Sequence, residues 1–436
     1  MLFSLEKPMH GKYWLIIFVI CLVFVYSFYR LASTYTFNDY VVNHKTYGTD
    51  AIEYQLTAVN VLNGHGITAH IIEDYSHYKI GIGKESLVNT FKESQSAREW
   101  FLVSNSLHVW HPPGYTLFLA FIYKFMGVSP FYVKLIQIIL LAWAASLMPL
   151  IGFFYWREIG IVSGMIASLV FINFFSPNPA LIRSEVLYVF LFSLWILLFS
   201  MWERMPLTIL TALLGIILGL ALLVKGACVF IAFFFLIYLF YRLKEFKKAR
   251  KHAIVFVFCL GLMILPWSMY ASIKIHGPVL LCTQIMPDLL AGNNEKSIQT
   301  GEWTPFWESK EHDDLYSRLK AIKYSDSKML MSFFVQNYKH VPQLLANKLR
   351  AAFHQATFVI FSMLFYYVAV FYFKRIHRDK DSLVPIFPLM FFINILLITL
   401  ILYGRYIIVV PFIYPLLIPG AYLPFYLGRF LYRIKS

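Results

Sequence analysis

Polar residues in the segment 48–66 could place a carboxylate for acid–base chemistry. At about 100° per residue they share one face of an expected helix, with apolar residues opposite: Asp50, Glu53, Tyr54, Thr57 and Asn60. A carboxylate on such a helix at the membrane surface can act as a general base. The spacing Asp50-x-x-Glu53 also fits a capping box, in which Asp50 is the N-cap and Glu53 reaches back to the backbone. Spacing alone leaves both interpretations open.

A further carboxylate, Glu185, follows the segment Ser176-Pro-Asn-Pro and stands at the start of an apolar block. A glutamate at the mouth of a membrane span is costly unless it faces protein or a polar cavity. Glu185 could therefore position an acceptor or assist Asp50. The alternative is a structural role at a helix N-terminus, where the helix dipole favours a carboxylate.

Three cations lie at ends of apolar blocks that the loop charges assign to the outer side of the membrane: Arg183, Lys225 and Arg405. Because Lys and Arg normally collect on the cytoplasmic side, their presence here indicates a bound anion. A lipid phosphate is the anion expected at that depth, and Arg would hold it bidentately and Lys as a point charge. Tyr406 follows Arg405 directly. The alternative is that these side chains reach anionic headgroups of the bilayer.

Two loop motifs could orient a substrate. The segment 110–115 reads Trp-His-Pro-Pro-Gly-Tyr, and its two prolines predict a rigid corner because they fix φ and exclude preceding helix. His111 in this corner could donate a hydrogen bond to a phosphate or a sugar, or the corner could only dock the loop on the bilayer. Asn293 and Asn294 predict a tight polar turn. His108 and His111 have no convincingly spaced third ligand, so we predict neither a metal site nor a cofactor.

These residues have to be positioned by membrane-spanning helices. Hydrophobic residues make up 59% of the 436 residues and charged residues only 14%, against about 25% charged in soluble proteins. The apolar residues form continuous blocks near the ~20 residues that a spanning helix needs, and they do not alternate as in a β-barrel. The sequence predicts an all-α polytopic membrane protein. The net charge of +15 then reflects basic cytoplasmic loops rather than nucleic-acid binding.

Ten apolar blocks are expected to cross the membrane: 13–32, 131–155, 159–175, 185–202, 207–223, 226–241, 253–273, 352–373, 383–403 and 406–428. The block Tyr115–Met126 is shorter and suits an interfacial helix. The segment 242–251 contains six basic residues and one acid, so it should be cytoplasmic. Ten spans with the N-terminus inside satisfy this, whereas a crossing by 115–126 would place 242–251 outside. A topology with eleven spans is the alternative.

This topology divides the chain into five parts. They are a cytoplasmic N-terminus with the first span (1–32), a first extracytoplasmic loop with interfacial helices that would be catalytic (33–130), spans two to seven (131–273), a second extracytoplasmic loop expected to form a lid (274–351), and spans eight to ten with a cytoplasmic tail (352–436).

Taken in order, these motifs resemble the GT-C superfamily of membrane glycosyltransferases, in particular bacterial relatives similar to protein O-mannosyltransferases and to aminoarabinose transferases of lipid A. The matching segments cover most of the chain: Asp50…Tyr54…Ala58…Gly64-x-Gly66, His111-Pro-Pro-Gly-Tyr115, Ser176-Pro177…Glu185, Leu223-Val-Lys225-Gly, Gly292-Asn-Asn294…Gly301-x-Trp303 and Arg405-Tyr406. The sequence departs from the family pattern where Ala51 replaces the second of two paired acids, and where Lys225 stands in place of a common Arg.

The resemblance implies a GT-C-like fold and inverting sugar transfer from a polyprenyl-phosphate donor to a lipid, glycan or protein hydroxyl. The site would face the periplasm of a bacterial inner membrane and need no nucleotide, and some relatives in the wider class use a divalent metal. The implied roles are catalysis by Asp50, Glu53 and Glu185, donor phosphate binding by Arg183, Lys225, Arg405 and Tyr406, and substrate positioning by Tyr54, His111, Asn293 and Asn294. The alternative is a transporter, flippase or polymerase of lipid-linked saccharides. A transporter leaves the two long outer segments unexplained, and a polymerase is expected to have arginine-rich outer loops.

Overall fold

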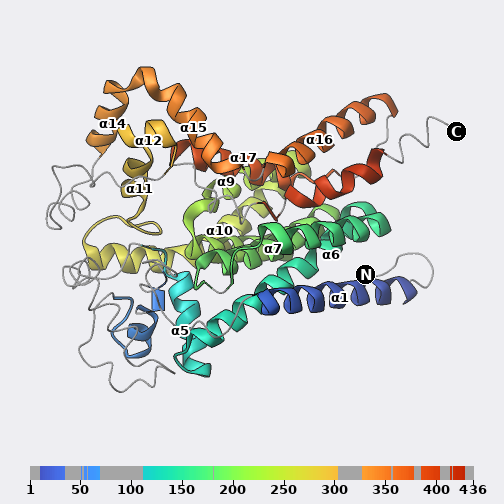
Figure 1. The fold of residues 1–436 in the computed structure, drawn as a ribbon, viewed down its shortest axis with the longest axis horizontal. Coiled ribbons are helices and arrows are strands. Elements are labelled where there is room, and N and C mark those ends of the chain that lie inside the picture. Colours follow the sequence, from blue (N-terminus) through green and yellow to red (C-terminus); the bar gives the residue numbers. More distant parts are fainter. Residues whose placement is uncertain are drawn as a thin grey trace.

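The computed structural model describes residues 10–34, 51, 54–55, 57–68, 111–179, 181–302, 327–354, 357–377, 384–402, 413–414 and 416–427. In this part of the chain the secondary structure is helical and contains no strand. The long helices run along one common axis, and a group of shorter helices lies at one end of them (Figure 1).

Long apolar helices confirm the prediction of a helical membrane protein. Among the described residues, five helices are long and apolar enough to cross a membrane: Trp14–Thr34, Pro130–Phe175, Ser184–Arg204, Gly226–Leu243 and Phe246–Ile275. A sixth candidate would join residues 338–353 to 357–371, which are bent by 96° where they meet. Shorter apolar helices add to the bundle: α5 (Gly114–Met126), α8 (Thr208–Val224), α17 (Phe387–Ile401) and Leu416–Leu427.

The helix α6 (Pro130–Val170), continued by η2 (Phe171–Phe175), is a hairpin of two antiparallel arms. Its backbone leaves the helical conformation at Trp156 and at Arg157, where φ is 55°. The arms approach so closely that a Cβ added to Gly160 would lie 1.9 Å from the carbonyl oxygen of Gly152. Further along, the hydroxyl of Ser168 donates to the carbonyl of Ala145 at 2.7 Å. The turn falls between the predicted blocks 131–155 and 159–175.

The helix α7 (Ser184–Arg204) gives the bundle two recognisable ends, because it carries Glu185 in its first turn and Glu203 in its last. We call these the Glu185 end and the Glu203 end. Arg30, near the end of α1 (His10–Thr34), donates to the Asn173 side chain at 3.1 Å, shortly before the chain reaches Glu185. Tyr155, at the α6 turn, donates to the Glu203 carboxylate. The chain therefore alternates in direction between the two ends through α1, the two arms of α6 and α7.

The later helices continue this alternation. Helix α8 returns to the Glu185 end, the short η3 (Gly226–Cys228) and α9 (Val229–Leu243) lead away from it, and α10 (Phe246–Ile275) comes back. Helices α8 and α10 pack closely, because a Cβ on Gly215 would lie 2.6 Å from the Phe256 carbonyl oxygen. Small residues at such contacts are what allow apolar helices to associate inside a membrane. Helices α16 (Thr357–His377) and α17 follow.

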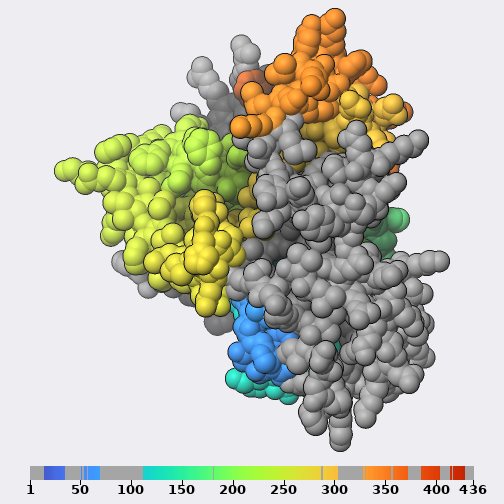
Figure 2. Space-filling model, turned by 90° about the vertical axis from the view of Figure 1, so that its left-hand side faces the viewer, coloured from blue at the N-terminus to red at the C-terminus, as the bar shows by residue number. Residues whose placement is uncertain are grey.

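The shorter helices gather at the Glu185 end: α5, α11 (Ile285–Gly292), α12 (Glu295–Thr300), α14 (Ser327–Gln336), η5 (Tyr338–His340) and α15 (Val341–Phe353). Figure 2 shows this end face-on, with described residues from the range 57–68 in blue below and α14–α15 in orange above. With 13 residues, α5 is about 20 Å long, which is short for a membrane span. Its interfacial placement, like the lid role of residues 274–351, stays a prediction.

Candidate functional site

The centre of the candidate site is an ion pair between Glu185 and Lys225. The ammonium Nζ of Lys225 lies 2.7 Å from Oε1 of Glu185, and the Lys225 side chain is 27% exposed against 10% for Glu185. The pair forms because α8 ends at Val224 and Lys225 is extended, with φ −158°, before the chain turns into η3. The start of α7 places the carboxylate opposite, where the helix dipole favours it.

A second cation gives this group a net positive charge. Arg183 is the N-cap of α7, and its guanidinium has a further favourable electrostatic interaction with the Glu185 carboxylate. Two cations then face one carboxylate. An ammonium has three N–H donors, and Glu185 is the one partner of the Lys225 ammonium among the described residues. From the sequence, Arg183 and Lys225 were expected to bind an anion together with Arg405, and Glu185 was expected to position an acceptor or to assist Asp50. The pairing of Glu185 with Lys225 was not predicted.

The corner at 111–114 docks next to this ion pair. A Cβ added to Gly114 would lie 2.7 Å from the carbonyl carbon and oxygen of Leu223, two residues before Lys225. Only glycine allows the chain to approach the end of α8 this closely. The corner carries His111, whose side chain is buried, at 7% exposure. Two motifs that are about one hundred residues apart in the sequence thus meet at the Glu185 end.

Aromatic rings connect the corner to the first predicted loop. The ring of Tyr54 lies 5.0 Å from the His111 ring and 4.9 Å from the Tyr115 ring, centroid to centroid. Residues 51, 54–55 and 57–62 are helical, and Tyr123 of α5 donates to the side chain of Gln55 at 3.1 Å. The polar side of this helix is buried along with its apolar side, since Thr57 is 0% exposed and Val59, on the opposite face, is 5% exposed. Protein therefore covers both faces, which the amphipathic pattern did not predict.

Gln137 ties the corner to the start of α7. Its Oε1 accepts from the Tyr115 hydroxyl at 2.6 Å and from the Arg183 backbone N–H at 3.3 Å. Its Nε2 donates to the carbonyls of Pro179 and Leu181 at 2.8 and 2.9 Å. One fully buried amide thus satisfies four groups and fixes the segment that carries Arg183. Gln137 was not predicted as a site residue, although a lone glutamine inside an apolar block indicates a buried polar contact.

Tyr115 is a fixed hydrogen-bond donor in this network. Burial raises the pKa of its hydroxyl well above its usual value, and the neighbouring Tyr123, Tyr54 and Glu185 raise it further. The hydroxyl therefore stays protonated at physiological pH and donates to Gln137. Its role is to hold the corner rather than to move protons.

The segment 279–281 forms a further wall of the site. It is held against α10, because Trp267 Nε1 donates to the Leu281 carbonyl at 2.7 Å and the Val279 N–H donates to the Ser272 hydroxyl at 2.9 Å. The side chain of Leu281 would lie 3.5 Å from a Cβ on Gly226, immediately after Lys225. This segment therefore places an apolar side chain against the backbone that directly follows Lys225.

Asn293 and Asn294 belong to a separate cluster built around Lys348. The ammonium of Lys348 is 0% exposed and donates to Asn293 Oδ1 at 2.7 Å and to the carbonyl of Leu400 at 3.1 Å. The Asn293 amide donates to the Ile401 carbonyl at 3.0 Å. Asn294 is the N-cap of α12 and forms a capping box with Ser297. In these contacts both asparagines stabilise the loop.

Gly301 explains why this loop can close. It ends α12 with φ +71°, and a Cβ there would lie 2.2 Å from the backbone of Asn347 in α15. The Asn347 amide donates to the carbonyls of Ile298 and Gln299 at 2.8 and 3.0 Å. Burial lowers the pKa of Lys348, in the polar helix α15, to about 7. The buried position of Lys348 was not predicted, because in the sequence this residue is one cation in an amphipathic pattern.

Helix α17 links the Lys348 cluster to the ion pair. Asn394 in α17 donates to the carbonyl of Ala227 at 2.9 Å, two residues after Lys225. Leu400, which accepts from Lys348, lies six residues further along the same helix, or about 9 Å. The loop of Asn293 and the ion pair are thus neighbouring but distinct parts of the Glu185 end.

The Glu203 end holds another buried carboxylate. The Glu203 side chain accepts from the hydroxyl of Tyr155 and, at 2.5 Å, from that of Tyr238. The guanidinium of Arg242 donates to the Glu203 backbone carbonyl at 2.9 Å, and that of Arg204 donates to the carbonyl of Phe154. Glu203 is 1% exposed. This cluster joins α6, α7 and α9.

Several predicted site residues lie outside the described part of the chain: Asp50, Glu53, Arg405 and Tyr406. Their roles stay predictions. Within the described residues, no group of three or more His, Cys, Asp or Glu side chains is arranged to hold a metal ion.

Comparison with protein-family models, with curated proteins and with solved structures found no match for this chain.

Proposed function

We propose that this chain is a membrane glycosyltransferase that moves a sugar from a polyprenyl-phosphate donor to a hydroxyl acceptor on the extracytoplasmic side. The observation that carries the proposal is the ion pair of Lys225 and Glu185 at 2.7 Å, with Arg183 beside it, at the end of an apolar helix bundle. A lipid phosphate fits this position, because its tail can lie along apolar helices while its charge stays at their ends. The net positive charge attracts it.

In the proposed reaction the oxygen of the acceptor hydroxyl attacks the anomeric carbon of the donor sugar. The bond from that carbon to the phosphate oxygen breaks, the phosphate keeps the electron pair, and the hydroxyl proton passes to Asp50. General-base assistance of this kind contributes roughly 10²–10⁴-fold to a rate. Lys225 and Arg183 stabilise the negative charge that develops on the departing phosphate. Direct attack inverts the configuration at the anomeric carbon.

Glu185 has a positioning role in this mechanism. Since its carboxylate is engaged by Lys225, it holds the ammonium at the mouth of the site rather than accepting the acceptor's proton. The remaining proposed roles are a second carboxylate at Glu53, further phosphate contacts from Arg405 and Tyr406, and positioning of substrates by Tyr54, His111, Asn293 and Asn294.

The proposal includes a topology of ten spans, with both termini in the cytoplasm of a bacterial cell and the Glu185 end facing the periplasm. Alternation of the described helices between the Glu185 end and the Glu203 end supports it. The shorter helices α8 and α17 count as spans in this topology, and α5 lies along the membrane surface. The basic segment 242–251 then lies at the cytoplasmic end, as the positive-inside tendency requires.

The proposal is tested by mass spectrometry of envelope lipids, glycans and proteins from a strain that lacks the chain. We expect one glycosylated molecule to be lost, and to return with the wild-type chain but not with Asp50→Asn. Asp288→Asn in α11 is the matched control, because it makes the same chemical change outside the proposed chemistry. An envelope with every glycosylated molecule intact contradicts the proposal. A normal product that accumulates on the wrong side of the membrane would instead indicate a flippase.

A further inference from the structure

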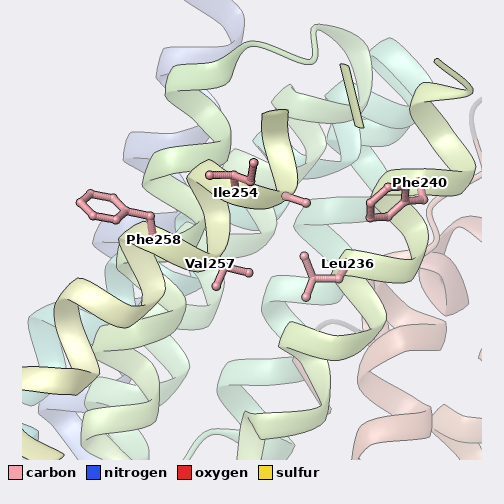
Figure 3. A pocket seen from close by; sticks show the side chains of 6 residues that line it. Leu236, Phe240, Ile254, Val257 and Phe258 are labelled. Carbon is pink, nitrogen blue, oxygen red and sulfur yellow. The ribbon is translucent and has the colours of Figure 1, made fainter. Parts of the chain in front are cut away.

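An apolar groove runs between α9 and α10 on the outside of the bundle. It has a volume of about 460 Å³ and is lined by Leu236, Phe240, Ala253, Ile254, Val257 and Phe258. Figure 3 shows Leu236 and Phe240 on one side of the space and Ile254 and Val257 on the other. Ile254 is 61% exposed and Val257 is 50% exposed, so the groove opens to the surroundings of the bundle. Leu236 lies eleven residues beyond Lys225, or about 17 Å along the helix, so the groove is separate from the candidate site.

A row of basic residues continues the groove along α10. Lys247, Arg250 and Lys251 precede Ile254 by seven, four and three residues. This spacing places them on the same helical face, between about 5 and 10 Å from Ile254 along the axis. All three are exposed, whereas Ala249 on the opposite face is buried. We call Lys247, Arg250 and Lys251 the basic face of α10.

Hydrogen bonds hold this part of α10 in place. The side chain of His252, next to Lys251, pairs with the Thr211 hydroxyl at 2.6 Å. Thr211 in turn accepts from Trp202 Nε1 at 2.9 Å. Arg242, near the end of α9, is fixed to the Glu203 carbonyl. The basic face and the apolar groove therefore keep a constant relation to each other, as a binding site requires.

We propose that this groove binds an anionic phospholipid, with one acyl chain between α9 and α10 and the phosphate headgroup on the basic face of α10. Along α10 the basic face comes first and the apolar groove follows, which is the order of the charged headgroup and the acyl chain in such a lipid. Its phosphate lies at the membrane surface, where it meets the basic face, and its chain runs inwards along the groove. Juxtamembrane basic residues attract anionic lipids in this way.

Charge selects the lipid over other occupants of the groove. A second copy of this chain, placed against the same face by two-fold symmetry, would bring two basic faces together. Like charges at such a contact repel each other. A zwitterionic phospholipid carries no net charge to match the basic face. A free phosphate ion matches the charge but leaves the apolar groove unoccupied.

Native mass spectrometry of the full-length chain in detergent tests the proposal. The probes are dioleoyl phosphatidylglycerol and dioleoyl phosphatidylcholine at equal concentration, which differ only in headgroup. We expect the wild-type protein to retain phosphatidylglycerol preferentially. Neutralising a basic residue near a headgroup weakens binding by about fivefold. The triple variant Lys247→Gln, Arg250→Gln and Lys251→Gln should therefore lose at least about tenfold, with Arg250→Gln alone losing less.

Two matched controls test whether the loss of retention is specific. One removes the same charge elsewhere, and the other adds a tryptophan outside the groove. Lys124→Gln, Lys339→Gln and Arg350→Gln together remove the same charge from exposed positions at the other end of the molecule, and should leave retention unchanged. Val257→Trp fills the groove and should reduce retention, whereas Val162→Trp, at a similarly exposed position with 46% exposure, should not.

Three results would overturn the proposal. Equal retention of the two lipids by the wild-type protein means that no anionic headgroup is selected. If the triple variant retains phosphatidylglycerol as well as the wild-type protein does, the basic face does not bind the headgroup. If Val257→Trp does so, the groove does not bind the acyl chain. A dimer that disappears in Val257→Trp would show that a second copy occupies the groove.

Discussion

Glu185 and Glu203 lie at opposite ends of α7, and the protein surrounds them in different ways. Glu185 pairs with the ammonium of Lys225, whose side chain is 27% exposed. Glu203 is enclosed by two tyrosine hydroxyls and is 1% exposed. The first turn of α7 therefore pairs with an accessible cation from the end of α8, whereas its last turn lies in a closed polar cluster.

This difference separates a binding arrangement from a structural one. At the Glu185 end, a cation remains accessible after the carboxylate is satisfied, and Arg183 adds a second positive charge. At the Glu203 end, hydrogen bonds join α6, α7 and α9, and the carboxylate oxygens already have donors. We infer that the Glu185 end binds a ligand and that the Glu203 end holds helices together.

The largest expected effect is on activity at the Glu185 end. Lys225→Met should lower sugar transfer by about 10²–10³-fold, as loss of one group that stabilises developing charge does elsewhere. Glu203→Gln at the other end should leave transfer within about twofold of the wild-type rate, because it lies far from the proposed chemistry. The measurement is product formation in membranes that contain equal amounts of each protein. Equal rates for the two variants would contradict the inference that the Glu185 end binds the ligand and the Glu203 end is structural.

The next effect is on stability at the Glu203 end. Glu203→Ala leaves the hydroxyls of Tyr155 and Tyr238 without their acceptor, and an unsatisfied buried group such as the Tyr155 hydroxyl costs about 1–3 kcal/mol. We expect the thermal unfolding transition to fall clearly in Glu203→Ala and only slightly in Glu203→Gln. An unchanged transition in Glu203→Ala would show that the cluster does not hold the helices. The measurement is thermal unfolding of the purified protein in detergent.

A smaller effect is expected where the corner meets α8. Gly114→Ala would place a Cβ 2.7 Å from the backbone of Leu223, and overpacking of this kind costs about 1–3 kcal/mol. It should also reduce transfer, because it moves His111 relative to Lys225. Gly261→Ala in α10 is the control, since its Cβ would meet Leu265 at an ordinary 3.5 Å. If both variants had the same stability and the same rate of transfer, the close approach at Gly114 would not be required for either.

The smallest effect, taken per pH unit, is a pH dependence of stability that arises from Lys348. Its pKa in the folded protein is about 7, below the usual value near 10.4, so the unfolded chain binds more protons between these values. The free energy of unfolding should therefore rise with pH from about 7 to about 10, by at most about 1.4 kcal/mol per pH unit. Lys348→Met should remove this part of the slope. A variant with the wild-type slope would show that Lys348 stays charged in the folded protein.

Part of the structure follows directly from the sequence. The apolar blocks 131–155 and 159–175 predicted two helices, and α6 turns at Trp156 and Arg157 between them. The prolines at 112 and 113 predicted a corner, which precedes the start of α5 at Gly114. These features depend on local chemistry: the length of an apolar run and the fixed φ of proline.

Other features could not be predicted, because they depend on which residues meet in the folded chain. Gln137 is one amide in an apolar block, and its four partners come from two distant segments, α5 and residues 179–183. Glu203 appears in the sequence as an ordinary charged residue near the end of an apolar block, and Lys348 as one cation in an amphipathic pattern. Pairing of Glu185 with Lys225 was also not predicted, although both were singled out for chemistry. Each case requires a long-range contact that periodicity does not encode.

The most direct test of the phosphate site is the binding of a polyprenyl monophosphate to the purified full-length chain in nanodiscs. We predict that Lys225→Met weakens binding at least tenfold and that Glu203→Gln leaves it unchanged. Equal affinity of the wild-type protein and Lys225→Met would contradict the assignment of the Glu185 end as the site that holds the donor phosphate.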